Sequence, residues 1–130
     1  MNVVDSSGWL EYFGSGANAE VFARPIEAIG ELLVPAITIT EVFKRILQQR
    51  TEQAALQAAA QMSQGRVIVL DAPLAMTAAR LGHTLKLPLA DSIILATARA
   101  HGALLWTQDE DFERIQGVRF VPKHAPDKVT

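Results

Sequence analysis

Short apolar segments alternate with helical segments along the whole chain, and this alternation restricts the possible fold more than any other feature. Strands that are separated by helices pair in parallel, so the pattern predicts an α/β protein with a parallel sheet and right-handed crossovers. Strands are expected at residues 3–4, 32–36, 66–70, 103–107 and 118–121, and helices at 7–13, 19–31, 38–49, 51–63, 71–85 and 90–101.

Local signals refine these boundaries. Pro25 is expected to interrupt the helix at 19–31 and to start its second half, because proline lacks the amide hydrogen that an interior helical residue donates. The run RVIVL at 66–70 predicts a buried strand. Residues 38–49 carry apolar side chains at i, i+3, i+4, i+7 and i+8 spacing, which predicts a helix facing the core. That stripe consists of Ile39, Val42, Phe43, Ile46 and Leu47.

Length and composition limit the class of protein. The 130 residues contain no internal linker and suit one domain over 1–122, followed by a short tail at 123–130. Cysteine is absent, which excludes disulfides and thiolate metal sites and is typical of a cytoplasmic protein. We expect neither a signal peptide nor a membrane span, since no basic segment precedes an apolar stretch and no apolar run reaches 18 residues. The net charge of −2 excludes strong diffuse attraction to nucleic acid, so such a partner needs a local basic patch or a metal.

Four carboxylates follow the predicted strands. Asp5 and Asp109 come after the strands at 3–4 and 103–107, Glu41 follows the strand at 32–36, and Asp91 opens the helix at 90–101. Because ligands of parallel sheets bind beyond the carboxyl ends of the strands, we expect these acids to converge at one edge. Nearby helix N-termini are expected to help keep them ionised.

Each acid also has a simpler interpretation. Asp5 and Asp91 fit helix capping or a first-turn acid, and Asp109 fits a turn. Glu41 fits a capping box with Thr38. Asp71 also follows a strand, but the Ala-Pro sequence after it makes capping sufficient, so it is left out of the site. The capping interpretations weaken when taken together, because four independent caps need not fall at one edge.

These pieces together resemble the PIN-domain ribonucleases, and among them the VapC-type toxins of toxin–antitoxin modules. The matching segments are VVDSSGW (3–9), PAITITEV (35–42), LPLADSIILATA (87–98) and TQDEDF (107–112), in order along nearly the whole chain. The resemblance implies a PIN fold, with a central parallel β-sheet and helices on both sides. It also implies a homodimer and a small cognate antitoxin as a protein partner. The implied site residues are Asp5, Glu41, Asp91 and Asp109, with Asp111 at a further acidic position and Ser6 and Thr107 at supporting hydroxyl positions.

The chemistry follows from the residue types. Carboxylates without histidine or cysteine partners suit Mg²⁺ or Mn²⁺. Such a cation favours hydrolysis of a phosphodiester by activated water. The resemblance implies that the substrate is RNA and that the protein is an endoribonuclease. Asp5 and Asp91 are expected to bind the principal metal, while Glu41 and Asp109 bind through water or hold a second ion. The alternatives are a DNA nuclease of related fold and a non-catalytic PIN-like module that binds protein or RNA.

Other motifs in the sequence are weaker indications of function. GSGANA (14–19) has the form of a dinucleotide fingerprint, but it follows a helix instead of a strand, which excludes the phosphate-binding geometry. Trp9 and Trp106 are interpreted as core residues. The three basic residues around 44–50 could contact RNA phosphates, although a solvated helix face is the favoured interpretation. These are Lys44, Arg45 and Arg50; the histidines, at 83, 101 and 124, lack metal-ligand spacing.

Overall fold

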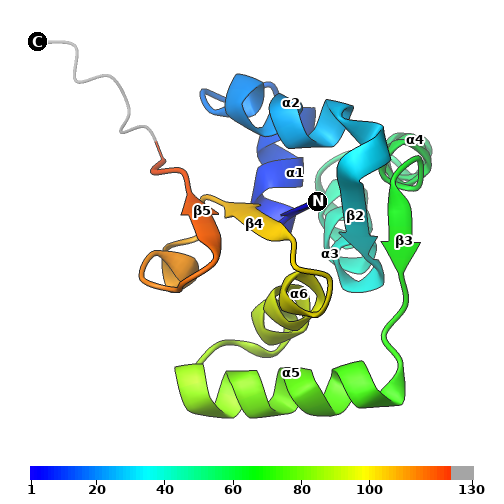
Figure 1. Ribbon diagram of the computed structural model, residues 1–130. Coiled ribbons are helices and arrows are strands. Elements are labelled where there is room, and N and C mark those ends of the chain that lie inside the picture. Colours follow the sequence, from blue (N-terminus) through cyan, green and yellow to red (C-terminus); the bar gives the residue numbers. More distant parts are fainter. Residues whose placement is uncertain (124–130) are drawn as a thin grey trace, which may run out of the picture.

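A five-stranded parallel sheet forms the centre of the protein, as the alternation of segments predicts (Figure 1). The computed structural model describes residues 1–123, so nearly all of the predicted tail, with His124, lies outside the described residues. The strand order is β3-β2-β1-β4-β5. The strands are β1 (Asn2–Val4), β2 (Leu32–Pro35), β3 (Arg66–Ile68), β4 (Leu104–Thr107) and β5 (Val118–Phe120).

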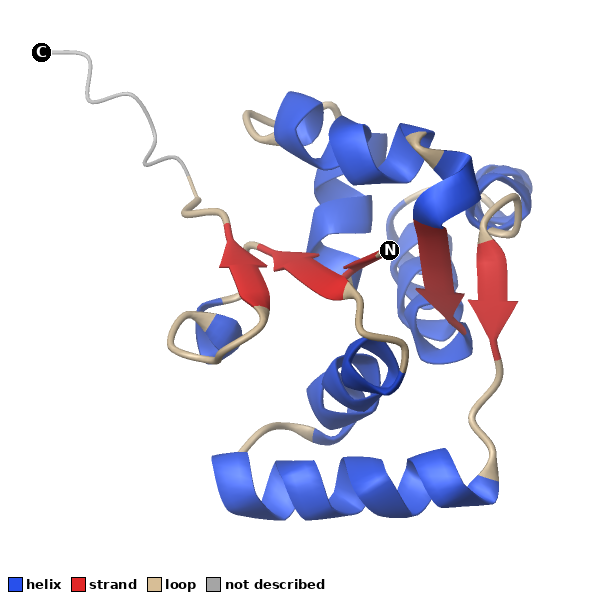
Figure 2. Ribbon diagram, in the orientation of Figure 1, coloured by secondary structure: helices blue, strands red, loops and turns tan. Residues whose placement is uncertain are grey.

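Within residues 1–123, six α-helices cover both faces of the sheet (Figure 2). They are α1 (Ser6–Phe13), α2 (Ala19–Glu27), α3 (Ala36–Gln49), α4 (Glu52–Met62), α5 (Ala72–Leu85) and α6 (Leu89–Ala100), with 3₁₀ segments η1 (Ile29–Glu31) and η2 (Glu110–Phe112). Among the described residues, no helix combines the length and the apolar character needed to cross a membrane.

Alternation along the strands divides the core into two layers. Val4 and Trp106 pack with α1 to α4 on one face, while Val3 and Leu105 pack with α6 on the other. Helix α5 lies outside α6 and contacts it through Ala78. Because α6 lies between the sheet and α5, its residues 91–98 are all buried. Both tryptophans, Trp9 and Trp106, are buried, as predicted.

Three local predictions are wrong. Helix α2 continues through Pro25, which is buried, and the chain breaks later, at Ala28. Strand β3 ends at Ile68 and is exposed, because it lies at the edge of the sheet and pairs only with β2. Helix α3 begins at Ala36, two residues before the predicted start, and the last residue of its stripe, Leu47, is 43% exposed.

Gly8 of α1 lies against the side chains of Phe22 in α2 and Val4 in β1. A β-carbon at this position would lie 2.7 Å from Phe22 Cδ1 and from Val4 Cγ1, and both of these side chains are fully buried. Gly8→Ala is therefore expected to lower the free energy of unfolding by about 1–2 kcal/mol. Core overpacking costs about 1–3 kcal/mol, which exceeds the roughly 0.5–1 kcal/mol that alanine gains in a helix.

Urea denaturation of Gly8→Ala measures this loss, and Gly30→Ala is the matched control. A β-carbon at Gly30 has no neighbour within 4 Å, so its substitution is expected to change the free energy of unfolding by less than about 0.5 kcal/mol. Equal stability of the two variants would show that the close contact at Gly8 is not limiting.

Candidate metal centre

The strand order places the candidate site at the carboxyl edge of the sheet. β1 pairs with β2 on one side and with β4 on the other, so the crossovers depart in opposite directions from this point. A hydrogen bond of 2.9 Å from the Asp5 amide to the Trp106 carbonyl continues the pairing beyond β1. In open α/β sheets, such a reversal of strand order is where ligands bind.

Asp5 lies immediately after β1 and is only 2% exposed. Its Oδ2 atom accepts hydrogen bonds of 2.8 Å from the Ser7 and Thr107 hydroxyls. The side chain makes no capping bond to α1, so the capping interpretation is not observed. Burial raises the pKa of Asp5, and the two hydroxyl hydrogen bonds oppose that rise.

Asp91 lies in the first turn of α6 and is 8% exposed. Burial, followed by the negative charges of Asp5, Asp109, Asp111 and Glu41, raises the pKa of Asp91 from 3.8 to about 7. The pKa of Asp91 therefore rises although the residue lies in the first turn of α6, because burial and the neighbouring negative charges favour its neutral form. All the other predicted acids therefore lie close enough to Asp91 for their charges to raise its pKa.

Asp91, Asp109 and Asp111 form the tightest group. One carboxylate oxygen from each lies within 4.8 Å of the others. Asp109 also caps η2, since its Oδ1 accepts a 2.9 Å hydrogen bond from the Asp111 amide. The Asp109 amide in turn donates to Thr107 Oγ1 at 2.9 Å, so one threonine side chain connects Asp5 with Asp109.

Glu41 is held by a serine and not by its own helix. The Ser6 hydroxyl donates to Glu41 Oε1 at 2.6 Å. The alternative interpretation of Glu41, a capping box with Thr38, is not observed, because Thr38 lies inside α3 and its hydroxyl donates to the Pro35 carbonyl at 2.7 Å. Asp5 and Glu41 thus border the three-acid group without belonging to it.

Sequence reasoning missed several polar residues beside the acids. Ser7 bonds to Asp5 and also accepts a 3.3 Å hydrogen bond from the Gln108 amide. The buried Asn18 donates from Nδ2 to Gln108 Oε1 and to the Pro122 carbonyl, at 3.0 Å each. The second serine of DSSG was visible beside Asp5, whereas nothing in the sequence connects Asn18 with residues about 100 positions away.

The donor set fits a divalent cation. Two oxygens bound to one Mg²⁺ lie about 3.0 Å apart when they are adjacent and about 4.2 Å apart when they are opposite, since each metal–oxygen distance is about 2.1 Å. One oxygen from each of the three acids lies within 4.8 Å of the others, so the group has about the size of a site for one cation. Hard oxygen ligands favour Mg²⁺ or Mn²⁺, and a cation would relieve the repulsion that acts on Asp91.

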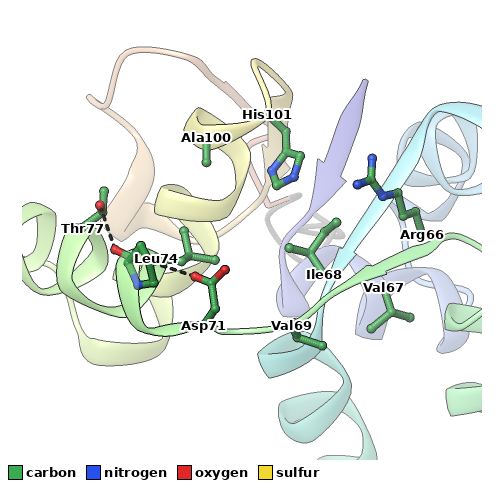
Figure 3. A pocket seen from close by; sticks show the side chains of 10 residues that line it. Arg66, Val67, Ile68, Val69, Asp71, Leu74, Thr77, Ala100 and His101 are labelled. Atoms are coloured by element: carbon green, nitrogen blue, oxygen red, sulfur yellow. Dashed lines mark hydrogen bonds between the residues drawn. The ribbon is translucent and has the colours of Figure 1, made fainter.

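A separate hollow of about 450 Å³ lies between β3, the start of α5 and the end of α6 (Figure 3). It contains Asp71 and His101 but none of the acids of the candidate centre. Asp71 accepts a hydrogen bond of 3.0 Å from the Leu74 amide, so it caps α5, as predicted (Figure 3).

Comparison with known proteins agrees with this geometry. The model of the PIN domain family matches residues 3–118. A toxin–antitoxin complex from Klebsiella pneumoniae is 27% identical, with a TM-score of 0.78 over 95% of this chain and 100% of that chain. VapC20 of Mycobacterium tuberculosis, described as a sarcin–ricin loop cleaving toxin, is 20% identical, with a TM-score of 0.72 over 93% of this chain and 97% of its own. FitAcB from Neisseria gonorrhoeae is 25% identical, with a TM-score of 0.63 and coverage of 96% and 100%. Comparison with curated proteins gave no match.

Proposed function

The chain belongs to the PIN domain family, and from that premise we propose that it is a VapC-type, metal-dependent endoribonuclease and the toxin of a toxin–antitoxin pair. The observation that carries this proposal is the acid group in which oxygens of Asp91, Asp109 and Asp111 lie within 4.8 Å of one another. Support for the RNA substrate comes from the fold that the chain shares with a toxin that cleaves the sarcin–ricin loop.

Each residue of the centre has a proposed role. Asp91, Asp109 and Asp111 would hold Mg²⁺ or Mn²⁺ together with the bordering Asp5 and Glu41. When bound, the cation supplies activation of water and stabilisation of the leaving oxygen. The Ser7 and Thr107 hydroxyls fix the orientation of Asp5, and the Ser6 hydroxyl fixes that of Glu41. Such hydrogen bonds to ligating carboxylates commonly change metal affinity or activity by about 10–100-fold.

Cleavage assays test the activity directly. The purified chain is expected to hydrolyse single-stranded or structured RNA in Mg²⁺ or Mn²⁺, and EDTA is expected to stop the reaction because the acids have no other means to activate water. Single-stranded DNA of matched sequence is the control for the alternative of a DNA nuclease. Cleavage that survives chelation would exclude the metal mechanism, and absence of cleavage of both polymers would favour the non-catalytic alternative.

The proposal includes two protein partners. The similarity to a toxin–antitoxin complex at 27% identity supports a small cognate antitoxin. A homodimer and a cytoplasmic location remain predictions from the family resemblance. Light scattering of the purified chain tests whether it forms a homodimer. Growth of cells that express the chain without an antitoxin tests whether it is toxic.

A further inference from the structure

A second hollow adjoins the acid centre, between α1, α3 and the segments that follow β4 and β5. It has a volume of about 320 Å³, and its lining includes Ser7, Glu11, Arg45, Gln108 and Lys123. Ser7 belongs to both places, because its hydroxyl donates to Asp5 Oδ2 at 2.8 Å and accepts from the Gln108 amide at 3.3 Å. The wall of this hollow is therefore one side chain away from the acids.

The charges of the hollow contrast with those of the acid centre. Arg45 comes from α3 and Lys123 from the segment after β5, so the fold brings two exposed cations from distant parts of the sequence to one cavity. Two cations beside a group of acids form the kind of local basic patch that a chain of net charge −2 needs in order to bind a polyanion.

Glu11, the acid in this lining, is held by neighbouring donors. Its Oε2 accepts a hydrogen bond of 2.8 Å from the backbone amide of Asn18, and its Oε1 accepts one of 3.4 Å from the side-chain Nε2 of Gln108. A β-carbon at Gly16 would overlap the Glu11 carboxyl group, so the second glycine of GSGANA leaves room for this carboxyl group in its observed position. These contacts fix Glu11 against the loop and partly offset its negative charge. The positive charges of Arg45 and Lys123 therefore dominate at the opening of the hollow.

We propose that this hollow binds a backbone phosphate of the RNA strand next to the phosphate that is cleaved, with Arg45 and Lys123 as its ligands. The inference rests on the proposed ribonuclease function and adds a substrate-binding site to it. Phosphate contacts of this kind fix the register of a strand without reading its bases. Arg45 and Lys123 would thus align the strand so that the next phosphate lies over the acids.

The test compares two double variants of equal net charge. In Arg45→Gln/Lys123→Gln, the Kd for a single-stranded RNA in EDTA, measured by fluorescence anisotropy, is expected to rise about tenfold. The slope of log Kd against log salt concentration is expected to fall by about 0.7 for each phosphate that the protein no longer neutralises. The control is Arg24→Gln/Arg80→Gln, in exposed residues of α2 and α5 outside the lining, and its Kd is expected to change less than about twofold.

Binding in EDTA is measured independently of cleavage, so this inference can fail while the nuclease proposal stands, and the reverse. If RNA is cleaved in Mn²⁺, Arg45→Gln/Lys123→Gln is expected to raise KM about tenfold and to change kcat by less than about threefold, because uniform binding is removed. Equal RNA affinity of both double variants would overturn the inference. Unchanged RNA affinity combined with weaker binding of an acidic peptide would assign the hollow to a protein ligand instead.

Discussion

Asp91→Asn is expected to lower RNA cleavage by a factor on the order of 10³ or more, while the metal-free protein remains as stable as wild type or becomes more stable. The loss corresponds to about 4 kcal/mol of transition-state stabilisation. The gain in stability arises because Asp91 is 8% exposed and surrounded by other acids, so removing its charge removes both a desolvation cost and a repulsion.

The pKa of Asp91 determines the sign of the pH dependence. Its pKa in the fold, about 7, lies above the ordinary value of 3.8, so between these pH values the folded protein holds a proton that the unfolded chain has released. Wild-type stability is therefore expected to fall as pH rises from about 4 to about 7. Asparagine cannot ionise, so this part of the pH dependence should be absent in Asp91→Asn. Asp91→Asn is therefore expected to be more stable than wild type by about 0.5–2 kcal/mol at pH 8, after allowance for solvent screening. At pH 4 the two free energies of unfolding are expected to be nearly equal.

Urea denaturation at pH 4 and pH 8 measures this difference, alongside an RNA cleavage assay. Asp71→Asn is the matched control, since Asp71 caps α5 outside the centre and asparagine caps about as well as aspartate. Asp5→Asn is expected to change cleavage and stability in the same directions as Asp91→Asn, because burial also raises the pKa of Asp5. Full activity of Asp91→Asn, or a loss of stability at pH 8, would contradict a shared acid site.

Mn²⁺ is expected to raise the melting temperature of the wild-type protein strongly. Binding to the folded state alone stabilises it by about 2.7 kcal/mol when the metal concentration is 100 times Kd. For a domain of this size, that free energy corresponds to roughly 10 °C. The three-acid group and the bordering Asp5 and Glu41 provide the ligands for this effect.

Thermal melts of wild type, Asp5→Asn and Asp91→Asn, each with Mn²⁺ and with EDTA, measure the metal response. Both variants are expected to gain less than wild type, because each lacks one anionic ligand, and Asp71→Asn is expected to gain as much. An equal response in all four proteins would place the metal elsewhere.

The sequence predicted the positions of the strands well because each strand of a parallel sheet is a short apolar run that local pattern can reveal. The sequence located β3 but predicted that it is buried, because RVIVL is apolar. Its exposure follows from its position at the edge of the sheet, which depends on which strands become neighbours. Similarly, the capping box at Glu41 was plausible locally but is replaced by the hydrogen bond from the Ser6 hydroxyl, which reaches Glu41 only in the folded chain.

The acids of the site were predictable for a related reason. Asp5 and Asp109 lie just after β1 and β4, and Asp91 lies in the first turn of α6, so the parallel topology brings these three acids to one edge. Glu41 lies farther along its helix, at the sixth residue of α3. The polar residues that support them were not predictable, because Asn18 and Gln108 have no local signature and meet only through tertiary contacts. The raised pKa of Asp91 was also beyond the sequence, since it depends on the burial of α6 between α5 and the sheet.

The pairing of β1 with β4 joins the second residue of the chain to residue 104. A ribosome that adds about 5–20 residues per second therefore synthesises Asp5 well before Asp91, Asp109 and Asp111. The central strand β1 can pair with β4 only after residues 104–107 have been synthesised. The acid centre cannot assemble until almost the whole polypeptide has emerged. If the chain is the proposed ribonuclease, a nascent chain would therefore remain inactive towards RNA until its synthesis is nearly complete.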